Sequence, residues 1–152
     1  MYTREEASRI RQAFWIGFGQ YMKPVPSASG EKVNWSNYKT GIPHLYFRMA
    51  AERKFASIAI ELTNPSAGIR LQQYDMLQQM SVILHQALEE EWTWLRETTD
   101  ENGNTLCRIY SELTDVSVFR ESDWPSVISF LKRRMMALDV FWTEVKPVFE
   151  TA

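Results

Sequence analysis

The segment Asp100-Glu101-Asn102-Gly103-Asn104 constrains the fold more than any other, because it separates two runs of residues typical of β-strands. An Asn-Gly pair accepts the positive φ angles that a tight hairpin turn needs. We therefore expect residues 92–99 and 105–113 to form two antiparallel strands. Residues 116–120 are predicted to add one further strand.

A second hairpin is predicted from strands over residues 44–51 and 54–63, joined at Glu52-Arg53. A two-residue loop at this point would place one apolar face of each strand together, and it would set His44 opposite Glu61. Because Glu-Arg is not a favoured pair for such a turn, a register displaced by two residues remains open. That register would keep the same apolar face.

Helical periodicity predicts three amphipathic helices, over residues 4–21, 67–91 and 124–146. The first should begin with a capping box, because Thr3 and Glu6 have the required spacing. These helices and strands predict one α+β domain with a mainly antiparallel sheet packed by long amphipathic helices.

The irregular stretch of residues 23–43 is rich in turn-forming residues, and a short strand is predicted near residues 33–35. With this strand the predicted order is α-β-β-β-α-β-β-β-α. No linker or repeat interrupts it, so we expect residues 1–152 to form a single domain.

Charge is distributed unevenly along the chain. Residues 1–60 carry nine Lys and Arg against four Glu, whereas residues 61–152 carry eight basic and fifteen acidic side chains. Such a gradient indicates a basic surface for an anionic partner, or an acidic surface that meets a second copy, unless folding interleaves the two halves. We favour interleaving.

Sequence features also indicate the compartment. Cys107 is the single cysteine, so the chain cannot form an internal disulfide, which fits a reducing environment. No apolar run approaches the length of a membrane span, and the N-terminal residues lack the apolar segment of a signal peptide. We therefore expect a cytoplasmic protein with no membrane partner.

Sequence motifs typical of common enzyme and cofactor sites are missing. The sequence contains no P-loop, no Rossmann glycine fingerprint and no nucleophile elbow. Two distant histidines and one cysteine do not suffice for a structural zinc site. We expect neither a cofactor nor a metal ion.

Polar and aromatic residues are densest between residue 32 and residue 48. Aromatic faces stack on bases while Lys and Arg contact phosphates, so this region is a candidate binding surface. The alternative is that Trp35 and Tyr38 turn inward and cap the sheet.

His44 and Glu61 would form either an acid–base pair or a structural cross-strand pair. The candidate binding residues are Lys23, Lys32, Asn34, Trp35, Asn37, Tyr38, Lys39, His44, Tyr46, Arg48 and Glu61.

Several short segments are recognisable together: Phe14-Trp15, Tyr21-Met22-Lys23-Pro24-Val25-Pro26-Ser27, Lys32-Val33-Asn34-Trp35, Asn37-Tyr38, Thr40-Gly41, Tyr46-Phe47-Arg48-Met49, Ile58-Ala59-Ile60, Glu90-Glu91-Trp92 and Trp124-Pro125 to Phe130. With these segments the chain resembles a bacterial family known as domain of unknown function 4268. Short free-standing members look like those of Bacteroidetes, and others resemble a C-terminal appendage of restriction-endonuclease-like proteins. The resemblance implies an association with DNA processing, and it carries over no catalytic residue.

A nuclease of the restriction-enzyme type has a similar order of elements, and its Mg²⁺ site needs an Asp followed on the next strand by Glu-x-Lys. Here no Asp precedes Asp75, and Thr63 stands where the Lys would follow Glu61. This spacing argues against hydrolysis.

We therefore predict a non-catalytic binding or accessory domain whose basic, aromatic region contacts nucleic acid or another anionic partner. One alternative is a module that self-associates as a homodimer, with the last helix as the contact. Another is a degenerate restriction-endonuclease-like fold without a complete metal site. Binding to phosphates weakens steeply as salt rises, whereas an apolar dimer interface should not, so salt dependence separates the first two.

Overall fold

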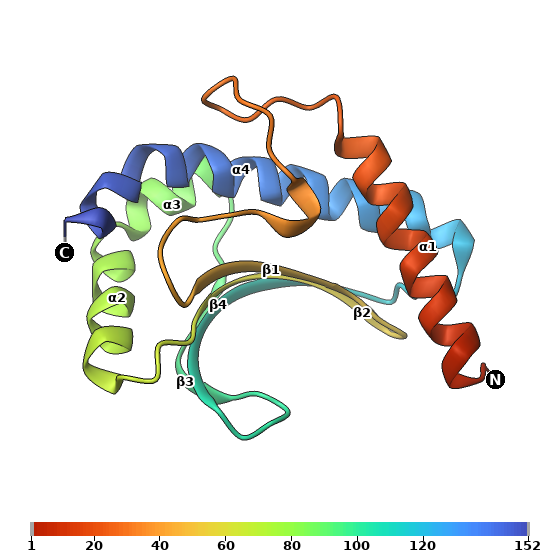
Figure 1. Ribbon diagram of the computed structural model, residues 1–152, viewed down its shortest axis with the longest axis horizontal. Coiled ribbons are helices and arrows are strands. Elements are labelled where there is room, and N and C mark those ends of the chain that lie inside the picture. The colour runs from red at the N-terminus through yellow and green to blue at the C-terminus, as the bar shows by residue number, and fades with distance from the viewer. Residues whose placement is uncertain (1, 152) are drawn as a thin grey trace.

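A computed structural model describes residues 2–151, which form a curved antiparallel sheet covered on one face by helices (Figure 1). The sheet has four strands in the order β1-β2-β4-β3. The α+β class and the antiparallel sheet predicted from the sequence are confirmed. The elements are α1 (Arg4–Met22), η1 (Trp35–Asn37), β1 (Leu45–Ala51), β2 (Phe55–Leu62), α2 (Ala67–Gln79), α3 (Ser81–Leu88), β3 (Thr93–Thr99), β4 (Thr105–Thr114), η2 (Glu121–Asp123) and α4 (Trp124–Glu150).

The prediction of a strand near residues 33–35 is wrong, because a 3₁₀ turn, η1, forms at this place instead. The side-chain oxygen of Asn34 accepts hydrogen bonds from the backbone N–H groups of Ser36 (3.1 Å) and Asn37 (3.2 Å). These bonds satisfy the free donors at the start of a turn, which is how an Asn side chain competes with strand formation.

The predicted strand over residues 116–120 is also wrong. Val118 donates one backbone hydrogen bond to Glu52 (2.9 Å), and Arg120 closes a turn on Ser117. The long helix predicted over residues 67–91 is interrupted at Met80, whose φ of −101° and ψ of 15° separate α2 from α3. Both differences shorten the regular elements without changing the fold class.

The β1–β2 hairpin takes the register displaced by two residues. Leu45 lies opposite Leu62 and Phe47 opposite Ile60, while the backbone N–H of Glu52 donates to Phe55 across the turn (2.8 Å). A shift of two residues keeps every side chain on its own face of the sheet, so the apolar face is preserved. Tyr46, and not His44, is the residue opposite Glu61.

The predicted β3–β4 hairpin is confirmed. Its turn is held by the Asp100 carboxylate, which accepts the backbone N–H groups of Asn102 and Asn104 at 2.9 Å each. Gly103 alone supplies a positive φ, of 80°, so the Asn-Gly pair acts mainly through its glycine. The register shifts between Leu95 and Thr98.

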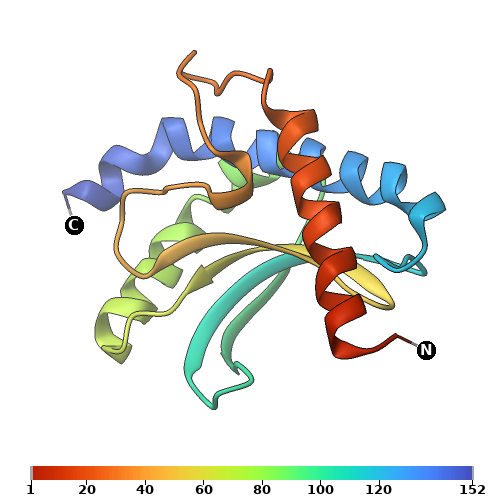
Figure 2. The ribbon, with the colours of Figure 1, turned by 45° about the vertical axis from the view of Figure 1, so that its right-hand side comes forward.

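One face of the sheet forms the core with the helices. Phe14 and Phe18 of α1 and Leu138 and Phe141 of α4 are completely buried there, and the capping box at Thr3 is present. Figures 1 and 2 show α1, α3 and α4 on this side, whereas no helix of the described chain covers the opposite, concave face. Within residues 2–151, no helix is both long and apolar enough to cross a membrane.

Candidate functional site

The concave face of the sheet carries two arginines, two tyrosines and a glutamate, which we call the open-face cluster. Strand alternation places these side chains opposite the buried Phe47 and Ile60, and register aligns them in adjacent rows. In one row Tyr46 pairs with Glu61 and Glu61 with Arg108; in the next, Arg48 and Tyr110 flank Ala59. The cluster consists of Tyr46, Arg48, Glu61, Arg108 and Tyr110.

Glu61 holds the two arginines of the cluster. Its Oε1 lies 3.0 Å from Nε of Arg48, and its Oε2 lies 3.3 Å from Nε of Arg108. The carboxylate is mostly buried, with a side-chain exposure of 18%, whereas the Arg48 side chain is 54% exposed. Glu61 therefore neutralises one of the two guanidinium charges. Glu112, opposite Ser57 on the same face, is an exposed second carboxylate that forms no ion pair with either arginine.

Each arginine of the cluster also stacks on a tyrosine of its own strand. The guanidinium carbon of Arg48 lies 4.2 Å from the centre of the Tyr46 ring, and Arg108 stands at the same distance from Tyr110. Stacking of a guanidinium on an aromatic face is attractive and limits the rotamers of both side chains. The cluster thus presents flat rings and planar donors in a fixed arrangement.

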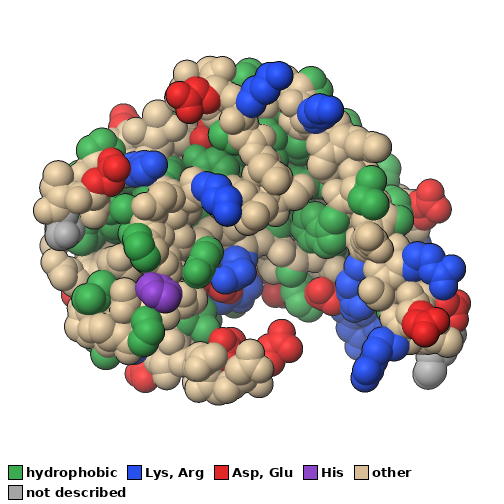
Figure 3. Space-filling view, in the orientation of Figure 1, with side chains coloured by type: hydrophobic (Ala, Val, Ile, Leu, Met, Phe, Trp, Pro, Cys, Tyr) green, Lys and Arg blue, Asp and Glu red, His purple; other side chains and the backbone are tan. Residues whose placement is uncertain are grey.

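Small residues form the floor between these side chains. Ala50 lies opposite Ser57, and Ala59 lies between Arg48 and Tyr110. Ser57 and Ala59 are almost fully buried beneath their larger neighbours. Figure 3 shows the resulting hollow under the sheet, with Lys and Arg side chains around it and acidic side chains among them.

The hollow continues to the end of the sheet. There Tyr46 and Arg48 line an open hollow of about 660 Å³ together with Thr63, Arg70 and Thr105. This volume falls within the range of small-molecule sites. At the other end, the β1–β2 turn carries the exposed Arg53 and Lys54.

Ion pairs do not level the charge gradient of the sequence. Of the seven salt bridges within residues 2–151, Arg48–Glu61 is the one that joins the basic half to the acidic half. The basic run on α4 is instead neutralised locally, because Arg133 and Arg134 contact Glu89 and Glu90.

The aromatic residues predicted between residues 32 and 39 turn inward. Trp35 is 3% exposed, and its indole N–H donates to the backbone oxygen of Val25 (2.9 Å). The hydroxyl of Tyr38 donates to the buried Asp139 (2.6 Å), and its ring stacks on Phe47. Burial, and then the hydrogen bond to Asp139, raise the pKa of the Tyr38 phenol well above its usual value. Both rings are therefore structural, in agreement with the alternative that Trp35 and Tyr38 turn inward and cap the sheet.

The remaining predicted residues do not form one surface. Lys23, Lys32 and Lys39 are exposed on the segment that crosses the helical side, and Asn34 is engaged in capping η1. Tyr46, Arg48 and Glu61 are brought together on the open face, while Asn37 and Tyr38 line a small hollow beside Tyr46 and Arg48.

The pairing of His44 with Glu61 is wrong. The observed register places His44 beside Thr63, whose backbone N–H donates to the His44 carbonyl oxygen (2.9 Å). Both carboxylate oxygens of Glu61 are engaged by arginines instead.

Arg108 and Tyr110 are the members of the cluster that the sequence did not identify. Their signal was present, because Arg108-Ile109-Tyr110 alternates polar and apolar residues within a predicted strand. What the sequence lacked was the pairing of β4 with β2, which sets Arg108 opposite Glu61. Non-local strand pairing of this kind is not encoded in a local pattern.

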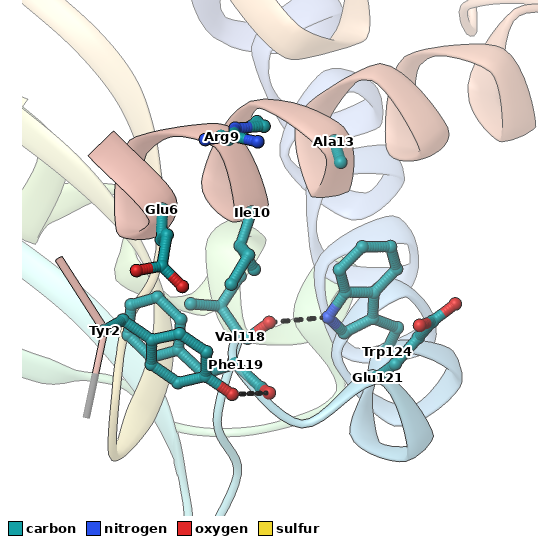
Figure 4. Close-up of a pocket in the computed structure, with 9 residues that line it drawn as sticks. All are labelled: Tyr2, Glu6, Arg9, Ile10, Ala13, Val118, Phe119, Glu121 and Trp124. Atoms are coloured by element: carbon teal, nitrogen blue, oxygen red, sulfur yellow. Dashed lines mark hydrogen bonds between the residues drawn. The ribbon is translucent and has the colours of Figure 1, made fainter. Parts of the chain in front are cut away.

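A second hollow, of about 620 Å³, lies between α1 and the segment before α4 (Figure 4). Two of its donors are used internally: the Trp124 indole N–H donates to the Val118 oxygen (2.7 Å), and the Tyr2 hydroxyl donates to Phe119. The Tyr2 ring also stacks on Phe119. Arg9 is the one basic side chain in the lining, beside the acidic Glu6 and Glu121, so this hollow suits an anion poorly.

Among residues 2–151, no three His, Cys, Asp or Glu side chains are grouped so that they could hold a metal ion. The open face carries guanidinium groups, aromatic rings and the Glu61 carboxylate.

These features define a class: an α+β domain that keeps one face of an antiparallel sheet open and lines it with paired arginines and tyrosines. The family model described as Domain of unknown function (DUF4268) matches residues 10–146. The chain belongs to this family, as the resemblance of its sequence indicated. No curated protein and no solved structure matches the chain.

Proposed function

We propose that this domain is a non-catalytic binding module that holds a single strand of nucleic acid against the open face of its sheet. The observation that carries the proposal is the open-face cluster, in which Arg48 and Arg108 share Glu61 and stack on Tyr46 and Tyr110. Single-strand binding uses aromatic faces for bases and basic side chains for phosphates.

The surroundings of the cluster support this ligand. The sheet is concave on this side, its floor is made of small side chains, and exposed Arg53 and Lys54 stand at one end. A single strand can lie along such a surface with its bases against the rings and its phosphates beside the guanidinium groups. The proposal places the protein in the cytoplasm, where its buried single cysteine, Cys107, would stay reduced.

The proposal is tested by fluorescence anisotropy with labelled single-stranded DNA and RNA between about 50 and about 200 mM salt. Arg48→Ala and Arg108→Ala should each weaken binding about tenfold at low salt and reduce the salt slope by about 0.7. Arg133→Ala is the matched control, because Arg133 is also an exposed arginine paired with a glutamate, but lies on α4. No binding by the wild-type protein at low salt would refute the proposal.

Glu61→Gln tests the proposal in the opposite direction, because it should raise the affinity for nucleic acid rather than lower it. The substitution removes the negative charge between the two guanidinium groups while preserving the size of the side chain. If phosphates bind beside Arg48 and Arg108, affinity should rise about twofold at low salt, because repulsion is removed. An affinity that falls as far as in the arginine variants would show that Glu61 itself contacts the ligand, contrary to the proposal.

Self-association is a second candidate function, favoured by exposed aliphatic side chains on the packed helices α3 and α4. Val82 is 66% exposed, Val140 52% and Val148 50%. Sedimentation velocity over a range of protein concentrations tests it: a dimer through this surface should persist at high salt and be lost in Val140→Glu. Such a dimer would leave the open face free, so the two functions are compatible.

A further inference from the structure

Arg70 is a buried guanidinium without an acidic partner. The residue is 8% exposed, its Nη1 donates to the backbone oxygen of Asn64 (2.8 Å), and its guanidinium group also faces the neutral thiol of Cys107. Its buried Nε–H has no acceptor among residues 2–151. Among residues 2–151, no carboxylate lies within salt-bridge distance of this side chain. A buried charge without a counter-charge is unfavourable, so a site of this kind favours a bound anion.

This arginine lines the hollow at the end of the sheet, next to the open-face cluster. Arg48, which is paired with Glu61, stands in the same lining. Thr105 adds a hydroxyl group, whereas the Thr63 hydroxyl donates to the His44 carbonyl oxygen (3.3 Å). Pro65 also lines the hollow and comes just before α2, whose N-terminal end favours negative charge. Two guanidinium groups, the Thr105 hydroxyl and a helix start thus surround one open space.

One acidic side chain, Asp100, also lines the hollow. Its oxygens accept the backbone N–H groups of Asn102 and Asn104 and the Asn104 side chain. These bonds lower the pKa of Asp100 and hold its carboxylate in the hairpin turn. Asp100 is therefore held in the turn and forms no salt bridge with Arg70. Because it stays ionised, its charge opposes an anion in the hollow, and the two guanidinium groups have to outweigh it.

We propose that this hollow binds the terminal phosphate of a nucleic-acid strand that lies on the open face. The inference rests on the proposed function for the strand, and on the unpartnered Arg70 for the phosphate. A terminal phosphate monoester carries more negative charge than an internal diester, and Arg70 and Arg48 together supply two guanidinium groups. The place of the hollow, at the end of the sheet, suits the end of a strand.

The first arm of the test uses inorganic phosphate alone. Thermal unfolding is followed in phosphate and in chloride at equal ionic strength, for wild type, Arg70→Met and the control Arg96→Met. Arg96 is an exposed arginine on β3, paired with Asp75. Phosphate should raise Tm in wild type and in Arg96→Met but not in Arg70→Met. An equal rise in all three would reveal a general salt effect and overturn the inference.

The second arm uses one oligonucleotide sequence with a 5′-phosphate, a 3′-phosphate or hydroxyl groups at both ends. Wild type should bind one phosphorylated form about tenfold more tightly than the hydroxyl form. Arg70→Met should remove that preference and leave the affinity for the hydroxyl form unchanged. Arg70→Lys, which keeps the charge and loses the planar donor pair, should retain a reduced preference.

The two arms separate the two proposals, and the wild-type measurements do not depend on the folding of any variant. Binding of all three oligonucleotides with equal affinity would overturn the phosphate site and leave the proposed function standing. Stabilisation by inorganic phosphate without binding of any oligonucleotide would overturn the proposed function and leave an anion site at Arg70.

Discussion

Two regions of this protein combine aromatic and charged residues, and they use them in opposite ways. In the segment of residues 23–44, Trp35 and Tyr38 donate their polar hydrogens to partners within the chain, and both rings lie against the core. On the open face, Tyr46 and Tyr110 carry arginines on their rings above a floor of small residues. Whether a ring is structural or available therefore depends on where the register and the helices place it.

The segment of residues 23–44 is held to α4 by three hydrogen bonds, of which one is buried and two are partly buried. Asp139 accepts from the Ala28 backbone (2.7 Å) and from Tyr38, and the Trp142 indole N–H donates to the Thr40 oxygen (2.8 Å). Among residues 2–151, no helix holds the open face through comparable hydrogen bonds. The comparison predicts that substitutions in the first region change stability, whereas those in the second change binding.

The largest effect on stability is expected from Asp139→Ala. It leaves a backbone N–H and the Tyr38 hydroxyl without their acceptor, so the free energy of unfolding should fall by about 3 kcal/mol. Urea denaturation measures the loss, and Glu144→Ala, an exposed acid on the same helix, is the control. Oligonucleotide affinity of the folded variant should be unchanged. A comparable loss of affinity would break the distinction between the two regions.

The double substitution Tyr46→Ala, Tyr110→Ala should produce the largest loss of binding. Base–aromatic stacking contributes about 1 to 3 kcal/mol for each base, so the affinity should fall about 30-fold or more. The free energy of unfolding should change by less than about 1 kcal/mol, because neither ring belongs to the buried core. Tyr21→Ala, at an exposed tyrosine of α1, is the control for binding. A large loss of stability with little loss of affinity would show that these two tyrosines are structural and do not bind the ligand.

Tyr38→Phe should lower the free energy of unfolding by about 1 kcal/mol near neutral pH, since one buried hydrogen bond is lost. The pKa of Tyr38 is raised in the folded protein, whereas in the unfolded chain the phenol ionises near pH 10.0. Stability from this group is thus complete below about pH 10 and decreases as the pH rises above it. Wild type should therefore lose stability above pH 10 more steeply than Tyr38→Phe, as urea titrations at a series of pH values can show. Parallel curves would contradict the buried hydrogen bond.

The smallest effect is expected from Lys23→Ala and Lys32→Ala. Both lysines are exposed, and the segment that joins α1 to η1 lies on the helical side of the sheet, away from the concave face (Figure 1). Removing either should change oligonucleotide affinity by less than about twofold through long-range charge alone. Anisotropy at low salt provides the measurement. A tenfold loss of affinity in either variant would show that the binding surface includes this segment, contrary to the proposal.

Much of the fold could be predicted from the sequence, because its signals are local. The capping box at Thr3, the hairpin turn at Gly103 and the three-to-four spacing of α4 each depend on neighbouring residues. One prediction failed where a side chain competed with a regular pattern, because Asn34 capped a turn in place of a strand. The helix predicted as one element is interrupted at Met80, where no side-chain hydrogen bond caps the start of α3.

The site could be predicted only in part, for a different physical reason. Tyr46 and Arg48 were predicted as part of the polar, aromatic region, and Glu61 was predicted as the partner of His44 in a register that proved wrong. Arg108 joins them only through the pairing of β2 with β4, which brings together residues 47 positions apart. Trp35 and Tyr38 turn inward because each donates a hydrogen bond to a partner elsewhere in the chain, Trp35 to Val25 and Tyr38 to Asp139. A local sequence pattern does not reveal such partners.

The most direct test of the account is an NMR titration of the isotope-labelled protein with a single-stranded oligonucleotide at low salt. We expect the shift changes to concentrate on the β1, β2 and β4 residues of the open face, above all Tyr46, Arg48, Arg108 and Tyr110. Signals of Trp35 and Tyr38 should stay in place. Shift changes confined to residues 23–39, with none on the sheet, would contradict the account.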